Sequence, residues 1–244
     1  MENNFSFDAD ELLSLINDKT KLIILNSPAN PTGGVVPESE LAKLVKGLLK
    51  FPNVYILSDE IYSRILFDDN RHISLKSFTE ISERVIVLDG WSKTYSMTGW
   101  RLGYGIYPKK IFGFAEKLAI NCHSCVNSAA QFAGIEALKG DQSQVNQMIK
   151  EFKVRRDFLV EELNKINNIS CLKPGGAFYV FPRIIKENMK SSEISKYLLE
   201  NKFVATVPGS SFGILGENFL RISYASSVKN LKDFIERLKT FMID

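Results

Sequence analysis

Residues 85–93 read Val85-Ile86-Val87-Leu88-Asp89-Gly90-Trp91-Ser92-Lys93, four aliphatic residues followed by small and polar ones. A short, continuous apolar run of this kind predicts a strand buried on both faces, as in a parallel sheet. Two earlier stretches have the same form. Leu22-Ile23-Ile24-Leu25 is followed by Asn26-Ser27, and Val54-Tyr55-Ile56-Leu57 is followed by Ser58-Asp59-Glu60. The three runs together predict a buried central sheet.

Helical patterns lie between these runs. Asp8–Asp18 is typical of an amphipathic helix, and a second helix is expected to open at Pro37 and to continue to Leu49. A further strand is expected from Leu102 to Tyr107. This alternation predicts an α/β domain with a largely parallel sheet. Ligands bind outside the carboxyl ends of strands in such sheets, so the polar residues after the three runs should converge on one crevice.

The chain changes character in its second half. Residues 109–164 are mostly helical in pattern, with a break expected near Gly140. Beyond them, three strands are expected at 176–181, 203–207 and 219–224, and two helices at 191–200 and 227–242. Strands and helices in this order predict a small α+β domain. We therefore expect a larger α/β domain over residues 1–148 and a small C-terminal domain over 149–244.

Composition excludes several classes of function. The 244 residues include 31 basic and 28 acidic ones, for a net charge of +3, and no block of like charge suggests a nucleic-acid-binding surface. No apolar run is long enough to span a membrane, and Met1–Phe5 lacks the pattern of a secretory signal, so a cytoplasmic location is expected. Cys122 and Cys125 flank His123, but without a second ligand pair they are interpreted as packed thiols, and no metal site is expected.

Four segments carry residues that suit one chemistry and follow in a fixed order. They are Asn26-Ser27-Pro28-Ala29-Asn30-Pro31-Thr32-Gly33, Asp59-Glu60-Ile61-Tyr62, Ser92–Tyr104 and Leu220-Arg221-Ile222-Ser223-Tyr224. Together they closely resemble the class I aminotransferases, which are pyridoxal-phosphate (PLP) enzymes of fold type I. The resemblance extends from near residue 5 to the C-terminus. The amino-acid sequences of the motifs are most similar to those of the aspartate, alanine and aromatic branch of the family.

The resemblance implies a role for each of these residues. Lys93 would hold PLP as a Schiff base and carry the proton between the substrate and the cofactor. Asp59 would pair with the protonated ring nitrogen of the cofactor, and Tyr62 would bind its phenolic oxygen. Asn30 would be a second contact to that oxygen and would also reach the substrate carboxylate. An Asn30–Pro31 peptide bond in the cis form is expected as well.

Two arginines complete the implied site. Arg101 would bind the cofactor phosphate and Arg221 the substrate α-carboxylate, because a guanidinium offers a planar pair of donors to an anion. Ser92 would be a further, weaker candidate for a phosphate contact, because the family more often places that hydroxyl where this chain has Gly90. Segments 174–179 and 208–213 resemble family segments near the mouth of the site but receive no catalytic role. His72 and His123 match no catalytic position.

The resemblance thus implies transfer of an amino group between an α-amino acid and a 2-oxo acid, in amino-acid metabolism and by a homodimer. A PLP-dependent lyase or synthase on the same fold is an alternative. The family also has an N-terminal region of domain size that this sequence lacks, so a third reading is a non-catalytic fragment that requires the missing half.

Overall fold

The computed structural model describes residues 5–243, so the first four residues of the predicted large domain and the last residue of the predicted small domain lie outside it. The chain divides into two compact units. The first, which we name the sheet unit, contains Glu2–Pro28 and Val35–Asn146. The second, which we name the C-terminal unit, contains Ala29–Gly34 and Gln147–Asp244.

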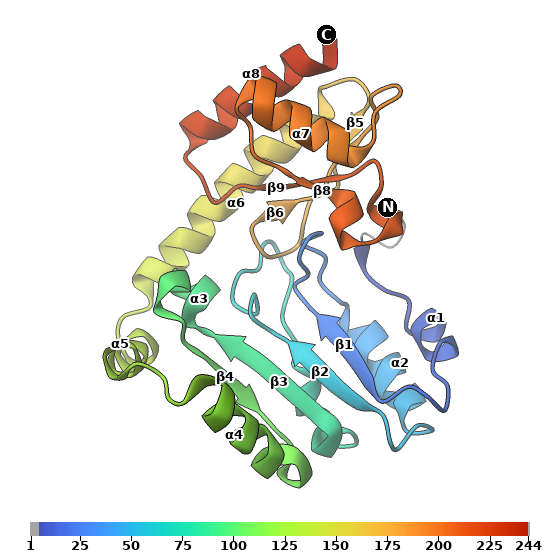
Figure 1. The fold of residues 1–244 in the computed structure, drawn as a ribbon, viewed down its shortest axis with the longest axis vertical. Coiled ribbons are helices and arrows are strands. Elements are labelled where there is room, and N and C mark those ends of the chain that lie inside the picture. Colours follow the sequence, from blue (N-terminus) through green and yellow to red (C-terminus); the bar gives the residue numbers. More distant parts are fainter. Residues whose placement is uncertain (1–4, 244) are drawn as a thin grey trace. The chain divides into compact units, whose positions relative to one another are not determined.

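The sheet unit is built on four strands in the order β1-β2-β3-β4 (Figure 1). The strands β1 (Leu22–Asn26), β2 (Tyr55–Asp59) and β3 (Val85–Gly90) are parallel, and β4 (Gly103–Ile106) runs antiparallel to β3. Each expected strand is present within a few residues of its predicted position. The register pairs Asn26 with Asp59 and Asp59 with Leu88, so the polar ends of the three parallel strands are neighbours.

One face of this sheet is covered by α2 (Glu38–Leu48), which lies behind β1 and β2 in Figure 1. The helix begins after Pro37, whose fixed backbone suits a helix start. Its buried residues pack with Ile23 and Leu25 of β1 and with side chains of β2 and β3 in one hydrophobic core, together with α1 (Ala9–Ser14). The buried residues of α2 are Leu41, Leu44, Val45 and Leu48.

The expectation that the first run is buried on both faces is wrong. Ile23 and Leu25 face the core, but Leu22 is 42 % exposed and Ile24 is 70 % exposed. The reason is that β1 is an edge strand covered by helices on one face only, so its residues alternate between core and surface. The position of the strand is predicted correctly, but its burial on both faces is not.

The short helix α3 (Trp91–Thr94) lies between β3 and β4 in the sequence. Two longer helices, α4 (Lys109–His123) and α5 (Ser128–Lys139), follow β4. The predicted helical stretch is broken near Gly140 as expected, but also at 124–127, which the sequence did not indicate. Ser124 has a positive φ of 60°, and the side chain of Asn127 accepts a hydrogen bond from the Ala130 backbone N–H to begin α5.

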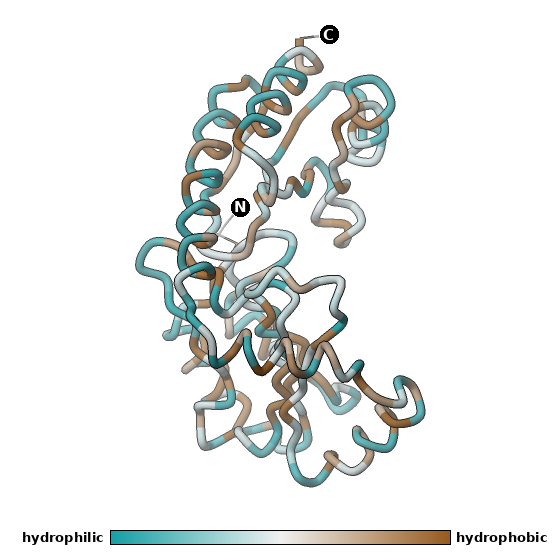
Figure 2. Tube along the Cα trace, turned by 90° about the vertical axis from the view of Figure 1, so that its left-hand side faces the viewer, coloured by the Kyte–Doolittle hydropathy of each residue, from teal (hydrophilic) through white to brown (hydrophobic). Residues whose placement is uncertain are grey.

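The C-terminal unit contains helices and short strands. The helix α6 (Ser143–Asn164) begins in the last residues of the sheet unit, and α7 (Ser191–Lys202) and α8 (Val228–Ile243) follow it in the sequence. The strands β6 (Tyr179–Val180), β9 (Leu220–Ser223) and β8 (Val207–Pro208) form one antiparallel sheet, and β5 (Ile169–Ser170) pairs with β7 (Arg183–Ile184). In Figure 2, polar and apolar residues alternate along α8, which buries one side.

Two predicted strands of this unit are shorter than expected. The strand expected at 203–207 starts only at Val207, because α7 ends at Lys202 and Phe203 adopts a left-handed conformation. The strand expected at 176–181 is reduced to β6, since Ala177 also has a positive φ, of 59°. Both apolar runs contain a left-handed residue that interrupts extended backbone.

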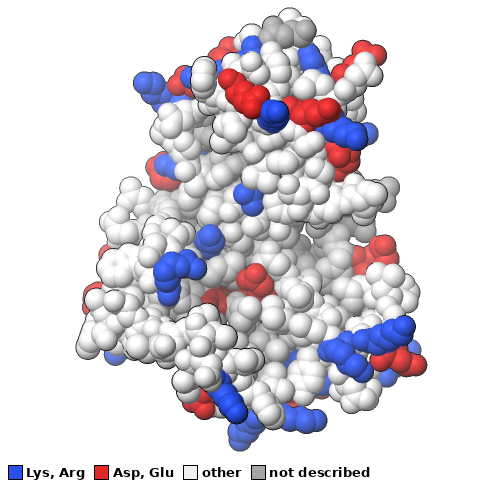
Figure 3. All heavy atoms as spheres, viewed as in Figure 1, with Lys and Arg blue, Asp and Glu red and all other residues white. Residues whose placement is uncertain are grey.

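The surface of the molecule carries both signs of charge. On the face drawn in Figure 3, lysine and arginine side chains are scattered among acidic ones, without a continuous patch of either sign. Within residues 5–243, no helix has the length and apolar character to cross a membrane. The same residues include no cluster of three or more histidine, cysteine or acidic side chains that could hold a metal ion.

Candidate active site

The predicted site residues fall into two groups, one in each unit. Asp59, Tyr62, Ser92, Lys93 and Arg101 belong to the sheet unit. Asn30 and Arg221 belong to the C-terminal unit, because the short segment Ala29–Gly34 is part of it.

Asp59 is the last residue of β2, in the middle of the polar ends of the parallel strands. Its carboxylate accepts a hydrogen bond from the Ile61 N–H at 3.2 Å, and its carbonyl accepts one from the Asn26 amide at 3.1 Å. Burial raises the pKa of Asp59, while the Ile61 N–H and the positive charge of Lys93 act in the opposite direction. The charged carboxylate is therefore under-solvated and suited to a positively charged partner.

Lys93 reaches the same region from the next strand. It lies on α3, which starts directly after β3, so its position follows from the end of that strand. The Nζ atom of Lys93 is 6.0 Å from the ring centroid of Tyr62, and Tyr62 is only 3 % exposed in the turn after Asp59. The structure thus brings Asp59, Tyr62 and Lys93 together. Ser92 precedes Lys93 on the same short helix and is half-buried.

A buried polar cluster lies beside Asp59, and the sequence did not reveal it. Glu60 is 6 % exposed, and its carboxylate accepts hydrogen bonds from the hydroxyls of Ser74 at 2.7 Å and Ser58 at 3.0 Å. The Nε2 atom of His72 lies 2.8 Å from the same carboxylate. Burial acts to raise the pKa of Glu60, but these hydrogen bonds outweigh it and the pKa is lowered. The buried Glu60 side chain thereby anchors the loop that contains His72 and Ser74.

A second carboxylate, that of the half-buried Asp89, belongs to the next-to-last residue of β3. It accepts hydrogen bonds from the Gly90 N–H at 2.6 Å and from the Tyr104 hydroxyl at 3.3 Å. Burial raises the pKa of Asp89, and burial together with the Asp89 charge raises the pKa of Tyr104 to about 12. Gly90 itself has no room for a side chain, since a Cβ there would lie 2.9 Å from both the Gly103 Cα and the Leu102 carbonyl oxygen.

Arg101 lies after the 3₁₀ turn η4 (Thr98–Trp100), with a left-handed backbone and an exposed side chain. Its guanidinium donates a hydrogen bond to the Thr98 carbonyl at 2.8 Å. Arg101 lines an open cavity of about 1110 Å³ within the sheet unit. The cavity is also bordered by Ser96 and Trp100 and by residues of α4 and of the 124–127 break. Cys122 lies on α4 and Cys125 just beyond it, but both thiols are exposed rather than packed.

In the C-terminal unit, the turn 29–34 places Asn30 next to Arg221. The Nη1 atom of Arg221 donates a hydrogen bond to Asn30 Oδ1 at 3.0 Å. The peptide bond from Asn30 to Pro31 is cis, as the resemblance implied. The turn is anchored at Gly33, whose carbonyl accepts hydrogen bonds from the Gly175 and Gly176 N–H groups, each at 3.0 Å.

Two aromatic residues adjoin Arg221. Its guanidinium carbon lies 4.6 Å from the ring centroid of Tyr179 and 5.3 Å from that of Phe212. Both rings belong to segments, 174–179 and 208–213, for which the sequence suggested no catalytic role. No local pattern marks them, because Tyr179 comes from another strand and Phe212 from the loop that precedes the strand of Arg221.

Comparison with known proteins identifies the family. Residues 1–238 match the family model of aminotransferase class I and II. The aspartate aminotransferase of Pyrococcus horikoshii is 40 % identical over 240 residues, which cover 98 % of this chain and 61 % of that protein. Among solved structures, an aromatic aminotransferase from Pyrococcus horikoshii superposes with a TM-score of 0.94 at 37 % identity, over 99 % of this chain and 65 % of that one.

An alanine aminotransferase from Pyrococcus furiosus gives a TM-score of 0.89 at 33 % identity, with 99 % of this chain and 62 % of that chain covered. The chain thus spans about 61 % of the length of the curated relatives that it matches. The expected α/β fold class is confirmed by these structures. With a family match over almost its whole length, the chain belongs to the class I and II aminotransferases.

Proposed function

We propose that this chain binds pyridoxal 5'-phosphate at Lys93 and serves the transfer of an amino group between an α-amino acid and a 2-oxo acid. The observation that carries the proposal is the grouping of Lys93 with the buried Tyr62 and the half-buried Asp59, at the carboxyl ends of parallel strands. Membership of the aminotransferase family supports it. Because the chain spans about 61 % of its curated relatives, catalysis by the whole protein is part of the proposal.

The residues of the sheet unit fit the cofactor chemically. The Lys93 amine can react with an aldehyde, and the Asp59 carboxylate, whose pKa is raised, can pair with a basic ring nitrogen. Arg101, which lines a large cavity, can bind a phosphate. When bound, the cofactor supplies an aldehyde that takes up the amino group and a ring that withdraws electrons from the substrate Cα.

The Lys93 amine has two tasks in this proposal. It would anchor the cofactor covalently. Once displaced by the amino acid, the free amine would take the proton from the substrate Cα and deliver it to the cofactor carbon that takes up the amino group. The ring of Tyr62, 6.0 Å from Nζ, forms one wall beside the amine. Asp59 is proposed to pair with the protonated ring nitrogen, because a cation there would offset the cost of burying the carboxylate charge.

The remaining contacts follow the same chemistry. Arg101 and the Ser92 hydroxyl are proposed to bind the phosphate, and Tyr62 and Asn30 the phenolic oxygen of the ring. A hydroxyl side chain at the position of Gly90 could not add a phosphate contact, because its Cβ would collide with Gly103 and Leu102. Arg221, with Asn30 on its Nη1 atom, is proposed to hold the substrate α-carboxylate and so to orient the Cα–H bond.

Further parts of the proposal concern the whole protein. It is a cytoplasmic homodimer with a large domain over residues 1–148 and a small domain over 149–244.

A second candidate function is that of a chain that requires another polypeptide segment for activity. It is favoured by Ile24 and Phe114 of the sheet unit, which are 70 % and 73 % exposed although apolar.

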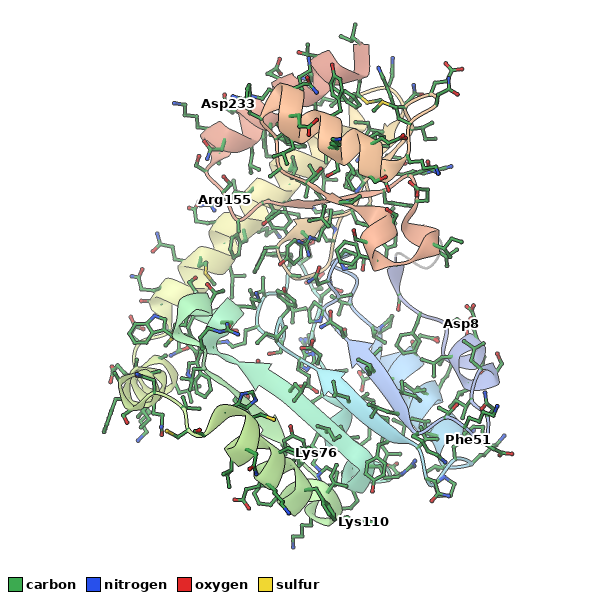
Figure 4. The ribbon with its side chains drawn as sticks, in the orientation of Figure 1. Asp8, Phe51, Lys76, Lys110, Arg155 and Asp233 are labelled. Atoms are coloured by element: carbon green, nitrogen blue, oxygen red, sulfur yellow. The ribbon has the colours of Figure 1, made fainter. Side chains whose placement is uncertain are left out.

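The test is an absorbance titration of the purified chain with pyridoxal 5'-phosphate, followed by borohydride reduction and peptide mass spectrometry. Lys93→Ala is the test variant. Lys110→Ala is the matched control, because Lys110 is exposed near the start of α4 (Figure 4) and reacts only as a surface amine does. We expect a new absorbance band and a reduced adduct at Lys93 in the native chain and in the Lys110 variant.

Each result separates the candidates. An adduct at Lys93 that gives a 2-oxo acid from an added amino acid supports the aminotransferase, whereas elimination products would favour a lyase or synthase. An adduct without turnover would favour the second candidate. Equal labelling of the native chain and of Lys93→Ala would overturn the cofactor role of Lys93.

A further inference from the structure

The side chain of Arg221 is enclosed on the sheet of the C-terminal unit. Arg221 lies on the central strand β9, opposite Val207 of β8, and Tyr179 of β6 pairs with Ser223 two residues further along β9. Residues two apart on a strand share a face, so Tyr179 lies on the face of Arg221 as its diagonal neighbour. This places the Tyr179 ring centroid 4.6 Å from the guanidinium carbon.

Phe212 contacts the same guanidinium from a loop. It ends the 3₁₀ turn η5 (Gly209–Phe212), and the next turn, η6 (Ile214–Gly216), leads back to β9. The base of this loop is closed at Gly209, whose N–H donates to the Phe219 carbonyl at 2.8 Å. A Cβ at Gly209 would lie 2.1 Å from the Gly216 carbonyl oxygen, so the two glycines allow the strands of the loop to meet.

The Phe212 ring is held by its neighbours. Its centroid lies 6.1 Å from that of Phe181 in an edge-to-face arrangement, and Phe181 stacks on Phe219 at 4.9 Å. The Phe212 side chain nevertheless stays 40 % exposed. A ring that is fixed on one side and accessible on the other can form a wall of a binding site.

The two rings restrict what the guanidinium can do. A guanidinium is planar, and its N–H groups all point outward in that plane. Aromatic rings within about 6 Å attract its charge and exclude water from its surroundings. Asn30 accepts from Nη1 at 3.0 Å and fixes the rotation of the plane. An anion that approaches the remaining edge therefore meets donors already held in one orientation.

We propose that Phe212, together with Tyr179, is a positioning residue for carboxylate binding at Arg221. The two rings form an aromatic clamp, defined by Tyr179 and Phe212, that holds the guanidinium in the plane required for two parallel hydrogen bonds to a carboxylate. The inference rests on the proposed role of Arg221 and adds to it the residues that set its geometry. Because the clamp already orders the arginine side chain, less conformational entropy is lost when a carboxylate binds.

The test measures carboxylate binding directly and needs neither cofactor nor turnover. Propionate is titrated into the full chain labelled with ¹⁵N-arginine, and the Nε–H signal of Arg221, assigned from its loss in Arg221→Lys, reports saturation by NMR. Phe212→Leu removes the ring but keeps an apolar side chain, and Phe212→Tyr keeps the ring. Phe203→Leu is the matched control, because Phe203 is 81 % exposed in the same unit.

We expect Phe212→Leu to raise the dissociation constant for propionate about 3- to 10-fold, in line with the strength of a partly exposed cation–π contact. Phe212→Tyr and Phe203→Leu should stay within twofold of the native chain, and circular-dichroism melting should show that all variants are folded. Native-like affinity in Phe212→Leu would overturn the clamp and leave the role of Arg221 intact. No response of the Arg221 signal to propionate in the native chain would overturn both.

Discussion

At the scale of single residues, Asp59 combines a structural cost with a proposed function. Burial raises its pKa, so the folded chain binds the Asp59 proton more tightly than the unfolded chain does. The stability that this proton contributes is fully present below the unfolded pKa and is lost as the pH rises through the folded pKa. At neutral pH the charged carboxylate therefore weakens the fold, and a further cationic partner would offset this cost.

The Asp59→Asn variant should accordingly be more stable than the native chain at pH 7, with a melting temperature about 1–3 °C higher, and the gain should vanish near pH 3. The same variant should bind pyridoxal 5'-phosphate at least tenfold more weakly, because an amide offers no charge to the ring nitrogen. Thermal melts at pH 7 and pH 3 and the absorbance titration measure both effects. Asp18→Asn, at an exposed position, is the control. A lower melting temperature with unchanged cofactor affinity would contradict the argument.

The pKa of Glu60, the next residue, is shifted in the opposite direction. Its pKa is lowered because the hydrogen bonds from His72 and Ser74 outweigh the effect of burial. A carboxylate with a depressed pKa contributes stability above its unfolded pKa, and this contribution is lost as the pH falls through the folded pKa. Adjacent carboxylates thus act on stability in opposite directions, one anchoring a loop and one facing the proposed cofactor.

Replacement of Glu60 by Gln should therefore cost about 1–3 kcal/mol of unfolding free energy at pH 7, since it leaves buried polar groups poorly paired. The difference from the native chain should shrink when the pH is lowered well below 4.5, the ordinary pKa of a glutamate side chain. Urea titrations at pH 7 and at pH 3.5 give the two values. A cost that is equal at both pH values would show that the shape of Glu60, and not its charge, anchors the loop.

At the scale of elements, the apolar runs locate the strands well, but not their surroundings. Val85, Ile86 and Val87 are buried as predicted, because β3 is a central strand, whereas Ile24 is exposed on the edge strand β1. A run of four aliphatic residues cannot distinguish these two cases, since the difference depends on which elements cover the strand. The strand expected at 203–207 fails for a different reason, because the left-handed Phe203 has no sequence signal of its own.

The turn 29–34 is an element whose geometry the sequence could only suggest. Gly33 has a φ of 68°, and a Cβ there would lie 2.4 Å from the Pro174 Cβ and 2.8 Å from the Gly176 carbonyl oxygen. The Gly33 carbonyl also receives the Gly175 and Gly176 N–H groups. Glycine is therefore required both by the backbone conformation and by the close approach of segment 174–176.

Gly33→Ala should destabilise the C-terminal unit by about 2 kcal/mol or more, through strain and through displacement of Pro174. It should also disturb the contact from Arg221 to Asn30 in the same turn, which the Arg221 NMR signal can report. Gly113→Ala is a control of opposite sign: it lies inside α4 with open space around it, and should stabilise by about 0.5–1 kcal/mol. Urea unfolding distinguishes the two. A neutral Gly33→Ala variant would mean that the turn relaxes freely.

At the scale of the whole molecule, the candidate site could be predicted where its residues follow the ends of neighbouring parallel strands. Asp59, Tyr62 and Lys93 follow strand ends and meet there, which the register of β2 and β3 explains. The Glu60 cluster and the aromatic clamp could not be predicted, because their members meet only through tertiary packing. Phe212, for example, is 33 residues from Tyr179 and is positioned by the loop that Gly209 closes.

The sheet unit exposes much of its apolar surface. The 15-residue helix α4 has no buried residue, although amphipathic helices normally bury their apolar side. On α4, Phe114 and Leu118 are 73 % and 65 % exposed, and Phe132 of α5 is 74 % exposed. The outer strands β1 and β4 also leave one edge each without a partner among the described strands. Such surfaces mark contacts with further polypeptide.

We therefore expect the 244-residue chain by itself to associate beyond a dimer in a concentration-dependent way. Sedimentation velocity between about 5 and 100 µM should show a growing fraction of larger species, and Phe114→Lys with Phe132→Lys should reduce that fraction without lowering the melting temperature, because neither side chain is buried. Leu215→Lys, at a 91 % exposed position of the C-terminal unit, is the control and should change association less. A discrete dimer at every concentration, unaffected by the double substitution, would show instead that the apolar surface of α4 and α5 does not drive association. The homodimer of the proposed function would then have to use another surface.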